Sequence, residues 1–189
     1  YNKPSQEGMY RHFSTIAGAI GELPVIVYNV PGRTGVNMLP ETALRLADIP
    51  NITSIKEASG NLEQMGEILR SAPDGFVLYS GDDALTLPVL SIGGHGIISV
   101  ASHVAGIQIK SMIDAFLAGD TVRAKELHLK LLPVFKAMFI ATNPTPVKAA
   151  VNMLGLDVGD VRLPLVSPVP AELAKIEAEL RKAGLMVQK

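Results

Sequence analysis

A lysine stands inside a segment that otherwise has the composition of a buried strand. The stretch "ITSIKEASG" (52–60) is rich in apolar and small residues, and Lys56 lies in its middle. Burial lowers the pKa of an ammonium group, and the neutral amine that results can attack a carbonyl carbon. A lysine at a strand end, with its head in water and Glu57 capping or pairing nearby, fits the same pattern. The local sequence therefore leaves two interpretations of Lys56 open, a nucleophile and an ordinary strand-end lysine.

Two further candidates lie in "VIVYNVPGRTG" (25–35). Tyr28 comes near the end of an apolar run, as Lys56 does, and a phenol there can relay protons in general acid–base catalysis. Arg33 follows in a turn-rich loop, where a guanidinium can hold a carboxylate through two parallel hydrogen bonds. Taken singly, Tyr28 is better explained as a core tyrosine with a satisfied hydroxyl, and Arg33 as a solvated loop arginine.

Strands and helices must alternate to position these residues. Short runs rich in Val and Ile predict strands that are covered on both faces, at 24–30, 52–58, 76–81 and 96–100. Stretches with helical character separate them, at 6–20, 40–47, 61–71, 83–92 and 103–118. This order predicts an α/β fold with right-handed crossovers. Because side chains alternate along a strand, Ser54, Lys56 and Ala58 should share one face, and Ile55 and Glu57 the other.

The strands stop near residue 120, and three helical stretches follow at 120–142, 144–155 and 167–185. Caps support them: Asp120 opens the first, and Pro170 lies in the first turn of the third. Four strand–helix units are half of a closed (β/α)8 barrel. An open nucleotide-binding sheet is disfavoured, because no glycine-rich phosphate loop follows any of the strands.

Composition excludes several classes of function. The net charge is −1 and the charges are scattered, so we expect no nucleic-acid partner. No apolar run reaches the roughly 20 residues of a membrane span. The four histidines lack metal-ligand spacing. The absence of cysteine rules out thiolate sites and fits a reducing compartment weakly, because it is also compatible with export. We therefore expect no metal and a cytoplasmic location. A start at tyrosine suggests processing or a fragment, whose missing end could have carried a signal.

Several motifs together resemble the pyruvate-dependent class I aldolase and lyase family. They are "YNVPGRTG" (28–35) and "SIKEASGN" (54–61), with "YNKPSQEGMYRHF", "LYSGDDA", "GGHGIISV" and "NPTPVKAA" in the family's order. The resemblance implies a (β/α)8 TIM barrel with a C-terminal all-helical domain. This chain would then carry barrel strands five to eight (residues 1–118) and the helical domain (residues 119–189), and strands one to four would lie outside it.

Within this family the match is strongest to members that condense pyruvate with L-aspartate 4-semialdehyde in lysine and diaminopimelate biosynthesis. The resemblance implies that Lys56 forms a Schiff base with pyruvate, that Tyr28 relays protons, and that Arg33 holds the carboxylate of the semialdehyde. It also implies that Ile98 lines the pyruvate pocket and that Gly81 lies near its floor. No metal or organic cofactor is implied.

The resemblance further implies a homotetramer built as a dimer of dimers. Tyr1 would reach across a dimer interface into the active site of the partner. A pair of threonines that binds the carboxylate of pyruvate would lie outside this chain.

Two alternatives remain. N-acetylneuraminate lyase and 2-keto-3-deoxy sugar acid aldolases share the lysine and the tyrosine, although Arg33 argues against them. The second alternative is that the chain is a noncatalytic fragment. A half-barrel lacks the neighbouring strands that would cover it, so it should expose apolar surface. We expect the 189-residue chain by itself to be inactive in turnover and the intact protein to be the enzyme.

Overall fold

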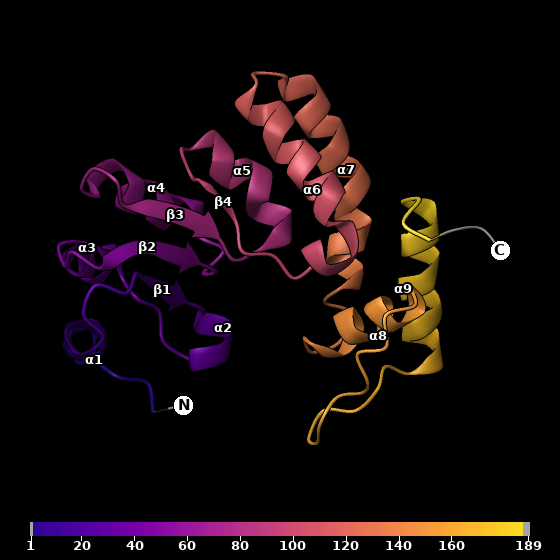
Figure 1. Cartoon of the computed structure of the whole chain (residues 1–189), viewed down its shortest axis with the longest axis horizontal. Coiled ribbons are helices and arrows are strands. Elements are labelled where there is room, and N and C mark those ends of the chain that lie inside the picture. Colours follow the sequence, from indigo (N-terminus) through magenta and orange to yellow (C-terminus); the bar gives the residue numbers. More distant parts are fainter. Residues whose placement is uncertain (1, 187–189) are drawn as a thin grey trace. The chain divides into compact units, whose positions relative to one another are not determined.

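The computed structural model describes residues 2–186 of the chain. The chain divides into two compact units, Tyr1–Ile98 and Ser99–Lys189 (Figure 1). Among the described residues, the first unit contains the strands, and the second contains helices joined by loops. The domain boundary that the sequence predicted, between residues 118 and 119, stays a prediction.

The first unit is built on a four-stranded parallel sheet. Its strands, in the order β1-β2-β3-β4, lie side by side in Figure 1. They are β1 (Val25–Asn29), β2 (Ile52–Glu57), β3 (Val77–Ser80) and β4 (Gly96–Ile97). All four predicted strands are confirmed, and the sheet with its intervening helices confirms the α/β class. The fourth strand is shorter than predicted, because the Ser99 side chain accepts a hydrogen bond from the Ser102 amide at 2.8 Å and turns the chain into a helix.

Helices alternate with these strands as predicted. They are α1 (Gln6–Ala19), α3 (Pro40–Ala47), α4 (Leu62–Ser71) and the segment after β3, which splits into a 3-10 helix (Asp83–Leu85) and α5 (Thr86–Ser91). One helix was not predicted: the loop after β1 contains a single turn, α2 (Pro31–Thr34). Pro31 is suited to a first helical turn, and Gly35, at φ 71°, ends the turn by donating to the Pro31 carbonyl.

The core of this unit lies between the sheet and its covering helices. Val27, Ile55 and Leu78 point to this side from β1, β2 and β3 and are at most 2% exposed. They belong to one apolar cluster with Met65 and Ile68 of α4. The predicted alternation in β2 is therefore confirmed, since Ile55 and Glu57 face the helices and Lys56 faces the other way.

The second unit packs four helices, α6 (Ser102–Leu117), α7 (Thr121–Ala137), α8 (Thr145–Met153) and α9 (Pro170–Lys182). Helix α6 packs against α7 and α8, and α9 packs against α7 and α8. Asp120 caps α7 by accepting from the Arg123 amide, as predicted. This helix ends at Ala137, five residues before the predicted 142.

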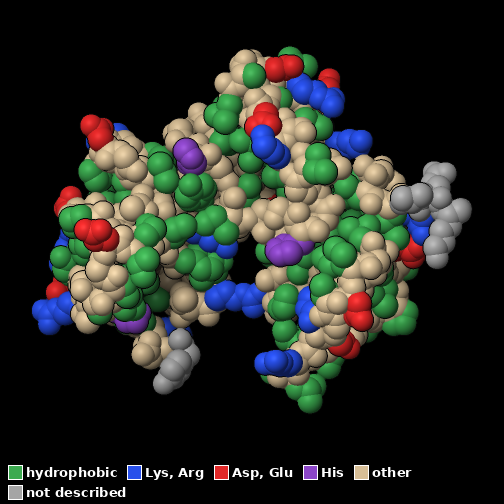
Figure 2. Space-filling view, in the orientation of Figure 1, with side chains coloured by type: hydrophobic (Ala, Val, Ile, Leu, Met, Phe, Trp, Pro, Cys, Tyr) green, Lys and Arg blue, Asp and Glu red, His purple; other side chains and the backbone are tan. Residues whose placement is uncertain are grey.

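The surface carries charges of both signs. Acidic and basic side chains are interspersed on the face shown in Figure 2. The ion pairs among the described residues are surface pairs, such as Glu7 with Arg11. Each of these contributes little to stability. None of the helices within residues 2–186 is long and apolar enough to cross a membrane.

Candidate active site

The structure brings Lys56 and Tyr28 together at the carboxyl ends of two neighbouring strands. The two residues are register partners in the parallel pairing of β1 with β2. The Lys56 Nζ lies 4.2 Å from the centroid of the Tyr28 ring. Both side chains lie on the sheet face opposite Val27 and Ile55, because side chains alternate along each strand. An amine and a phenol are thus within reach of one small substrate.

The surroundings shift both groups in useful directions. Burial lowers the pKa of the Lys56 amine, and the nearby carboxylate of Asp83 offsets part of that shift. Burial raises the pKa of the Tyr28 phenol, and the positive charge of Arg33 partly opposes this. A lowered amine pKa increases the fraction of neutral nucleophile, and a raised phenol pKa keeps the hydroxyl protonated as a donor.

Gly81 lies directly behind Lys56. A Cβ atom at this position would come within 2.7 Å of the Ala58 Cβ and within 3.2 Å of the Lys56 Cε. The Gly81 amide also donates to the Glu57 carbonyl at 2.7 Å, which ties the end of β3 to the end of β2. The lack of a side chain at residue 81 therefore leaves room for the lysine.

Two of the remaining predicted residues, Arg33 and Ile98, lie at the same end of the sheet as Lys56 and Tyr28. Arg33 lies in α2, exposed, and is near enough to influence the Tyr28 phenol. Ile98 directly follows β4 and is 37% exposed, and its amide donates to the Ser80 carbonyl at 3.0 Å. Tyr1 lies outside the described residues, so its proposed contact stays a prediction.

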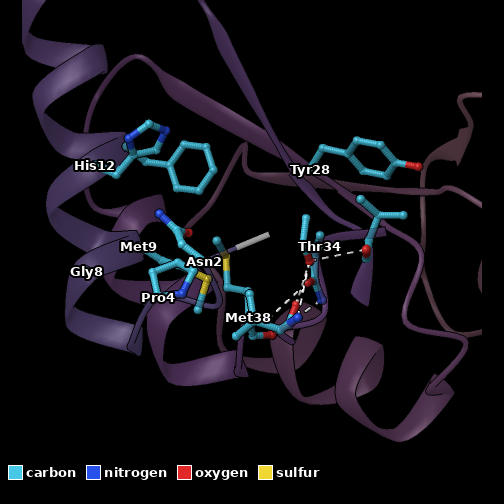
Figure 3. Close-up of a pocket in the computed structure, with 12 residues that line it drawn as sticks. Asn2, Pro4, Gly8, Met9, His12, Tyr28, Thr34 and Met38 are labelled. Carbon is cyan, nitrogen blue, oxygen red and sulfur yellow. Dashed lines mark hydrogen bonds between the residues drawn. The ribbon is translucent and has the colours of Figure 1, made fainter. Parts of the chain in front are cut away.

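A cavity of about 430 Å³ lies beside this site, between α1 and the segment after β1. Its lining includes Met9, His12, Phe13, Val36 and Met38 and is mostly apolar. Tyr28 contributes to the lining, but in Figure 3 its hydroxyl points away from His12 and Met9. Lys56 and Arg33 are not among the lining residues, so this cavity is not where the chemistry described above would occur.

Residues 1–183 match the sequence model of the dihydrodipicolinate synthetase family. The chain belongs to this family. It is 52% identical over 186 residues to the 4-hydroxy-tetrahydrodipicolinate synthase of Thermosynechococcus vestitus, an alignment that covers 98% of this chain and 63% of the relative. The membership confirms the resemblance found in the sequence motifs.

Solved structures of dihydrodipicolinate synthetase family members share the same fold. The enzyme from Cyanidioschyzon merolae, solved with lysine bound, is 48% identical with a TM-score of 0.97, over 98% of this chain and 63% of that one. A chloride-inhibited dihydrodipicolinate synthase from Acinetobacter baumannii, complexed with pyruvate, is 38% identical with a TM-score of 0.93, over 98% and 64%. The chain thus spans about 63% of the length of the curated relatives it matches.

One group of residues in this member of the dihydrodipicolinate synthetase family was missed by the sequence analysis. Glu57, Asn29, Asn37 and Gln64 form a hydrogen-bonded cluster on the helix-facing side of the sheet, below termed the amide–carboxylate cluster. Glu57 was interpreted as a capping or pairing residue beside Lys56. The available signal was its place in the alternation, which puts a carboxylate on the covered face of a strand.

Proposed function

We propose that this chain is the pyruvate-condensing part of a 4-hydroxy-tetrahydrodipicolinate synthase. The observation that carries the proposal is the Lys56–Tyr28 pair, an amine with a lowered pKa 4.2 Å from a phenol ring, in a chain of this family. The sheet would be strands five to eight of a (β/α)8 barrel, and the remaining helices its C-terminal domain. The substrates would be pyruvate and L-aspartate 4-semialdehyde.

The first step is imine formation. The neutral Lys56 amine attacks the ketone carbon of pyruvate, and the former carbonyl oxygen takes up a proton to give a carbinolamine. Loss of this hydroxyl as water, with a proton supplied by the Tyr28 phenol, leaves an iminium ion. The nitrogen gives up one of its two hydrogens and keeps the other on the iminium ion, so the released water carries one proton from the amine and one from the Tyr28 phenol. The Tyr28 ring, whose centroid lies 4.2 Å from the Lys56 Nζ, is close enough to the amine to support Tyr28 as the proton relay.

The second step makes the carbon–carbon bond. The iminium nitrogen accepts the electron pair left when the methyl group of pyruvate loses a proton, and an enamine forms. Its terminal carbon attacks the aldehyde carbon of the semialdehyde, and the aldehyde oxygen takes up a proton. Arg33 would hold the semialdehyde carboxylate through paired hydrogen bonds, which orients the aldehyde for this attack.

The last step releases the enzyme. The amino group of the adduct attacks the regenerated iminium carbon, the bond from that carbon to Lys56 breaks, and the lysine leaves as an amine. Ring closure yields the cyclic hydroxylated product. The iminium ion supplies the electron sink, so the reaction as written needs no metal or organic cofactor. We place it in the cytoplasm, in a homotetramer in which Tyr1 of one subunit completes the relay of another.

Trapping with borohydride tests this proposal. The chain is incubated with pyruvate and reduced, and its intact mass and the modified peptide are determined. We expect one reduced pyruvate adduct, on Lys56, and none in Lys56→Ala. An adduct that persists in Lys56→Ala would refute the assignment. In the intact protein, adding L-aspartate 4-semialdehyde should discharge the unreduced intermediate, whereas N-acetylneuraminate should leave it unchanged.

A further inference from the structure

Glu57 is a buried carboxylate that no part of the mechanism above uses. It is 0% exposed, at the end of β2. Among residues 2–186, no lysine, arginine or histidine forms an ion pair with it. Burying a charge without a cation is costly, and apolar residues of similar volume are often as stabilising as buried ionic groups. Stability by itself is therefore a weak explanation for a carboxylate here.

Three donors converge on this carboxylate. Its Oε2 accepts from the Asn29 Nδ2 at 2.9 Å and from the Gln64 Nε2 at 3.0 Å. Its Oε1 accepts from the Ser59 amide at 2.6 Å. Because all three neighbours donate, residue 57 must present a hydrogen-bond acceptor at both terminal atoms of its side chain. An amide of the same shape would direct an N–H group at another donor, whichever way it is turned.

The contact between Glu57 and Asn29 lies one residue beyond the proposed reactive pair. Tyr28 pairs with Lys56, and Asn29 with Glu57 is the next and last pair of the β1–β2 register. The side-chain hydrogen bond joins the two strands on the face opposite the reactive pair. The Glu57 carbonyl meanwhile accepts from the Gly81 amide of the neighbouring strand end. Glu57 therefore links the carboxyl ends of β1, β2 and β3.

The cluster also secures the segment that carries Arg33. Asn29 donates to the Asn37 Oδ1 at 2.8 Å, and its own Oδ1 accepts from the Met38 amide at 3.0 Å. Asn37 in turn donates to the Gln64 Oε1 at 2.8 Å, and Gln64 donates to the Met38 carbonyl at 3.1 Å. The loop that follows β1 and carries Arg33 is thus held at Asn37 and Met38 by the same amide–carboxylate cluster that holds the end of β2.

We propose that Glu57 is a positioning residue, which fixes Lys56 against Tyr28 through the hydrogen bond between Glu57 and Asn29. The inference rests on the proposed function, because it assigns a role in forming the Lys56 imine. Glu57 itself touches no substrate, since Lys56 and Glu57 point to opposite faces of β2. Misplacing a reacting group by about 1 Å can lower a rate up to a hundredfold.

The test is Glu57→Gln in the full 189-residue chain. The protein is mixed with pyruvate for set times, quenched with borohydride, and the Lys56 adduct is quantified by intact mass. We expect the limiting rate at saturating pyruvate to fall about tenfold to a hundredfold. The pyruvate concentration that gives half of that rate should hardly change, because Glu57 contributes no group to substrate binding.

A paired substitution separates positioning from a general loss of structure. When Asn29→Asp is combined with Glu57→Gln, the amide introduced on β2 can donate to the carboxylate introduced on β1, which restores the cross-strand hydrogen bond in the reverse direction. The Gln64 and Asn37 amides, which now donate toward Glu57 and Gln64, can turn over so that Gln64 accepts from residue 57 and Asn37 donates to residue 29. We expect this double variant to recover most of the lost rate. It also serves as the test variant if E57Q does not fold.

Two matched controls accompany these variants. Glu63→Gln makes the same chemical change at an exposed position in the first turn of α4. Ile68→Val loosens the buried core of α4 without touching the amide–carboxylate cluster. Both should form the adduct at the unmodified rate, even where I68V lowers the midpoint of urea unfolding as much as E57Q does.

The outcomes are distinct. If the unmodified chain forms no adduct on Lys56, the proposed function fails and this inference fails with it. If the unmodified chain forms the adduct and a folded E57Q forms it equally fast, only the positioning role is overturned. A double variant that folds yet stays as slow as E57Q would also overturn it, as would an equal loss of rate in I68V.

Discussion

Replacing Gly81 by alanine should displace Lys56 and slow imine formation. The added Cβ would lie 2.7 Å from the Ala58 Cβ, 3.2 Å from the Glu57 carbonyl oxygen and 3.2 Å from the Lys56 Cε. Carbon atoms in contact lie at about 3.5–4.0 Å, so the approach to Ala58 is about 1 Å too close. The Lys56 side chain can swing aside, but Ala58 and the carbonyl can move only with the backbone.

The magnitude follows from two opposing effects. Overpacking of this kind costs about 1–3 kcal/mol. Replacing glycine by alanine restricts the unfolded chain and returns about 0.4–1 kcal/mol. Gly81 lies outside the positive-φ region, so backbone strain does not add to the cost. We therefore expect Gly81→Ala to lower the free energy of unfolding by about 1–2 kcal/mol and the rate of adduct formation on Lys56 by about tenfold or more.

Urea titration and timed borohydride quenching measure these two quantities. Gly96→Ala is the matched control, because a Cβ there would meet only the Tyr79 ring, at 3.8 and 3.9 Å, which is ordinary contact. It should leave the adduct rate unchanged and the stability equal or slightly higher. If G81A forms the adduct at the unmodified rate with unchanged stability, the close contact behind Lys56 does not constrain the lysine. Equal losses in G81A and G96A would likewise refute the reasoning.

Two further predictions concern charge. Asp83→Asn removes a carboxylate that raises the pKa of Lys56, so the pKa of Lys56 should fall further. The pH midpoint of adduct formation should then move to lower pH. An unchanged or higher midpoint in the pH profile would contradict this. In the intact protein, Arg33→Lys keeps the positive charge but loses the planar fork. Discharge of the pyruvate intermediate should then need about 10–100-fold more L-aspartate 4-semialdehyde, with adduct formation itself unchanged. Equal semialdehyde dependence in the two proteins would argue against Arg33 as the carboxylate ligand.

The strands were predictable because each is a short apolar run rich in Val and Ile, and side chains alternate between the two faces of any strand. The same alternation placed Lys56 and Glu57 on opposite faces of β2, as the structure confirms. The pairing of Tyr28 with Lys56 could not be predicted from such a local pattern. Register between two strands is set by packing across the sheet, and no local pattern encodes it. The proximity of these two residues therefore came from the family resemblance, and the β1–β2 register confirms that they are adjacent.

Two features escaped the sequence for physical reasons. Helix α2 is one turn long, too short to show a helical period, and only Pro31 and Gly35 mark its ends. The amide–carboxylate cluster draws Asn29, Asn37, Glu57 and Gln64 from separate segments of the chain. Polar contacts of this kind have no periodic signature. They are determined by tertiary structure, which brings donors and acceptors together after the backbone is placed.

The orientation of Glu57 bears directly on the chemistry of its neighbour. A carboxylate paired with Lys56 would favour the ammonium form and remove the nucleophile. The pleat of β2 instead turns Glu57 to the opposite face, where it accepts hydrogen bonds from Asn29, Gln64 and the Ser59 amide. Lys56 is left beside an aromatic ring, with burial as the main influence on its pKa. The same two residues of β2 can therefore supply a reactive amine on one face and hold the strand end in place from the other.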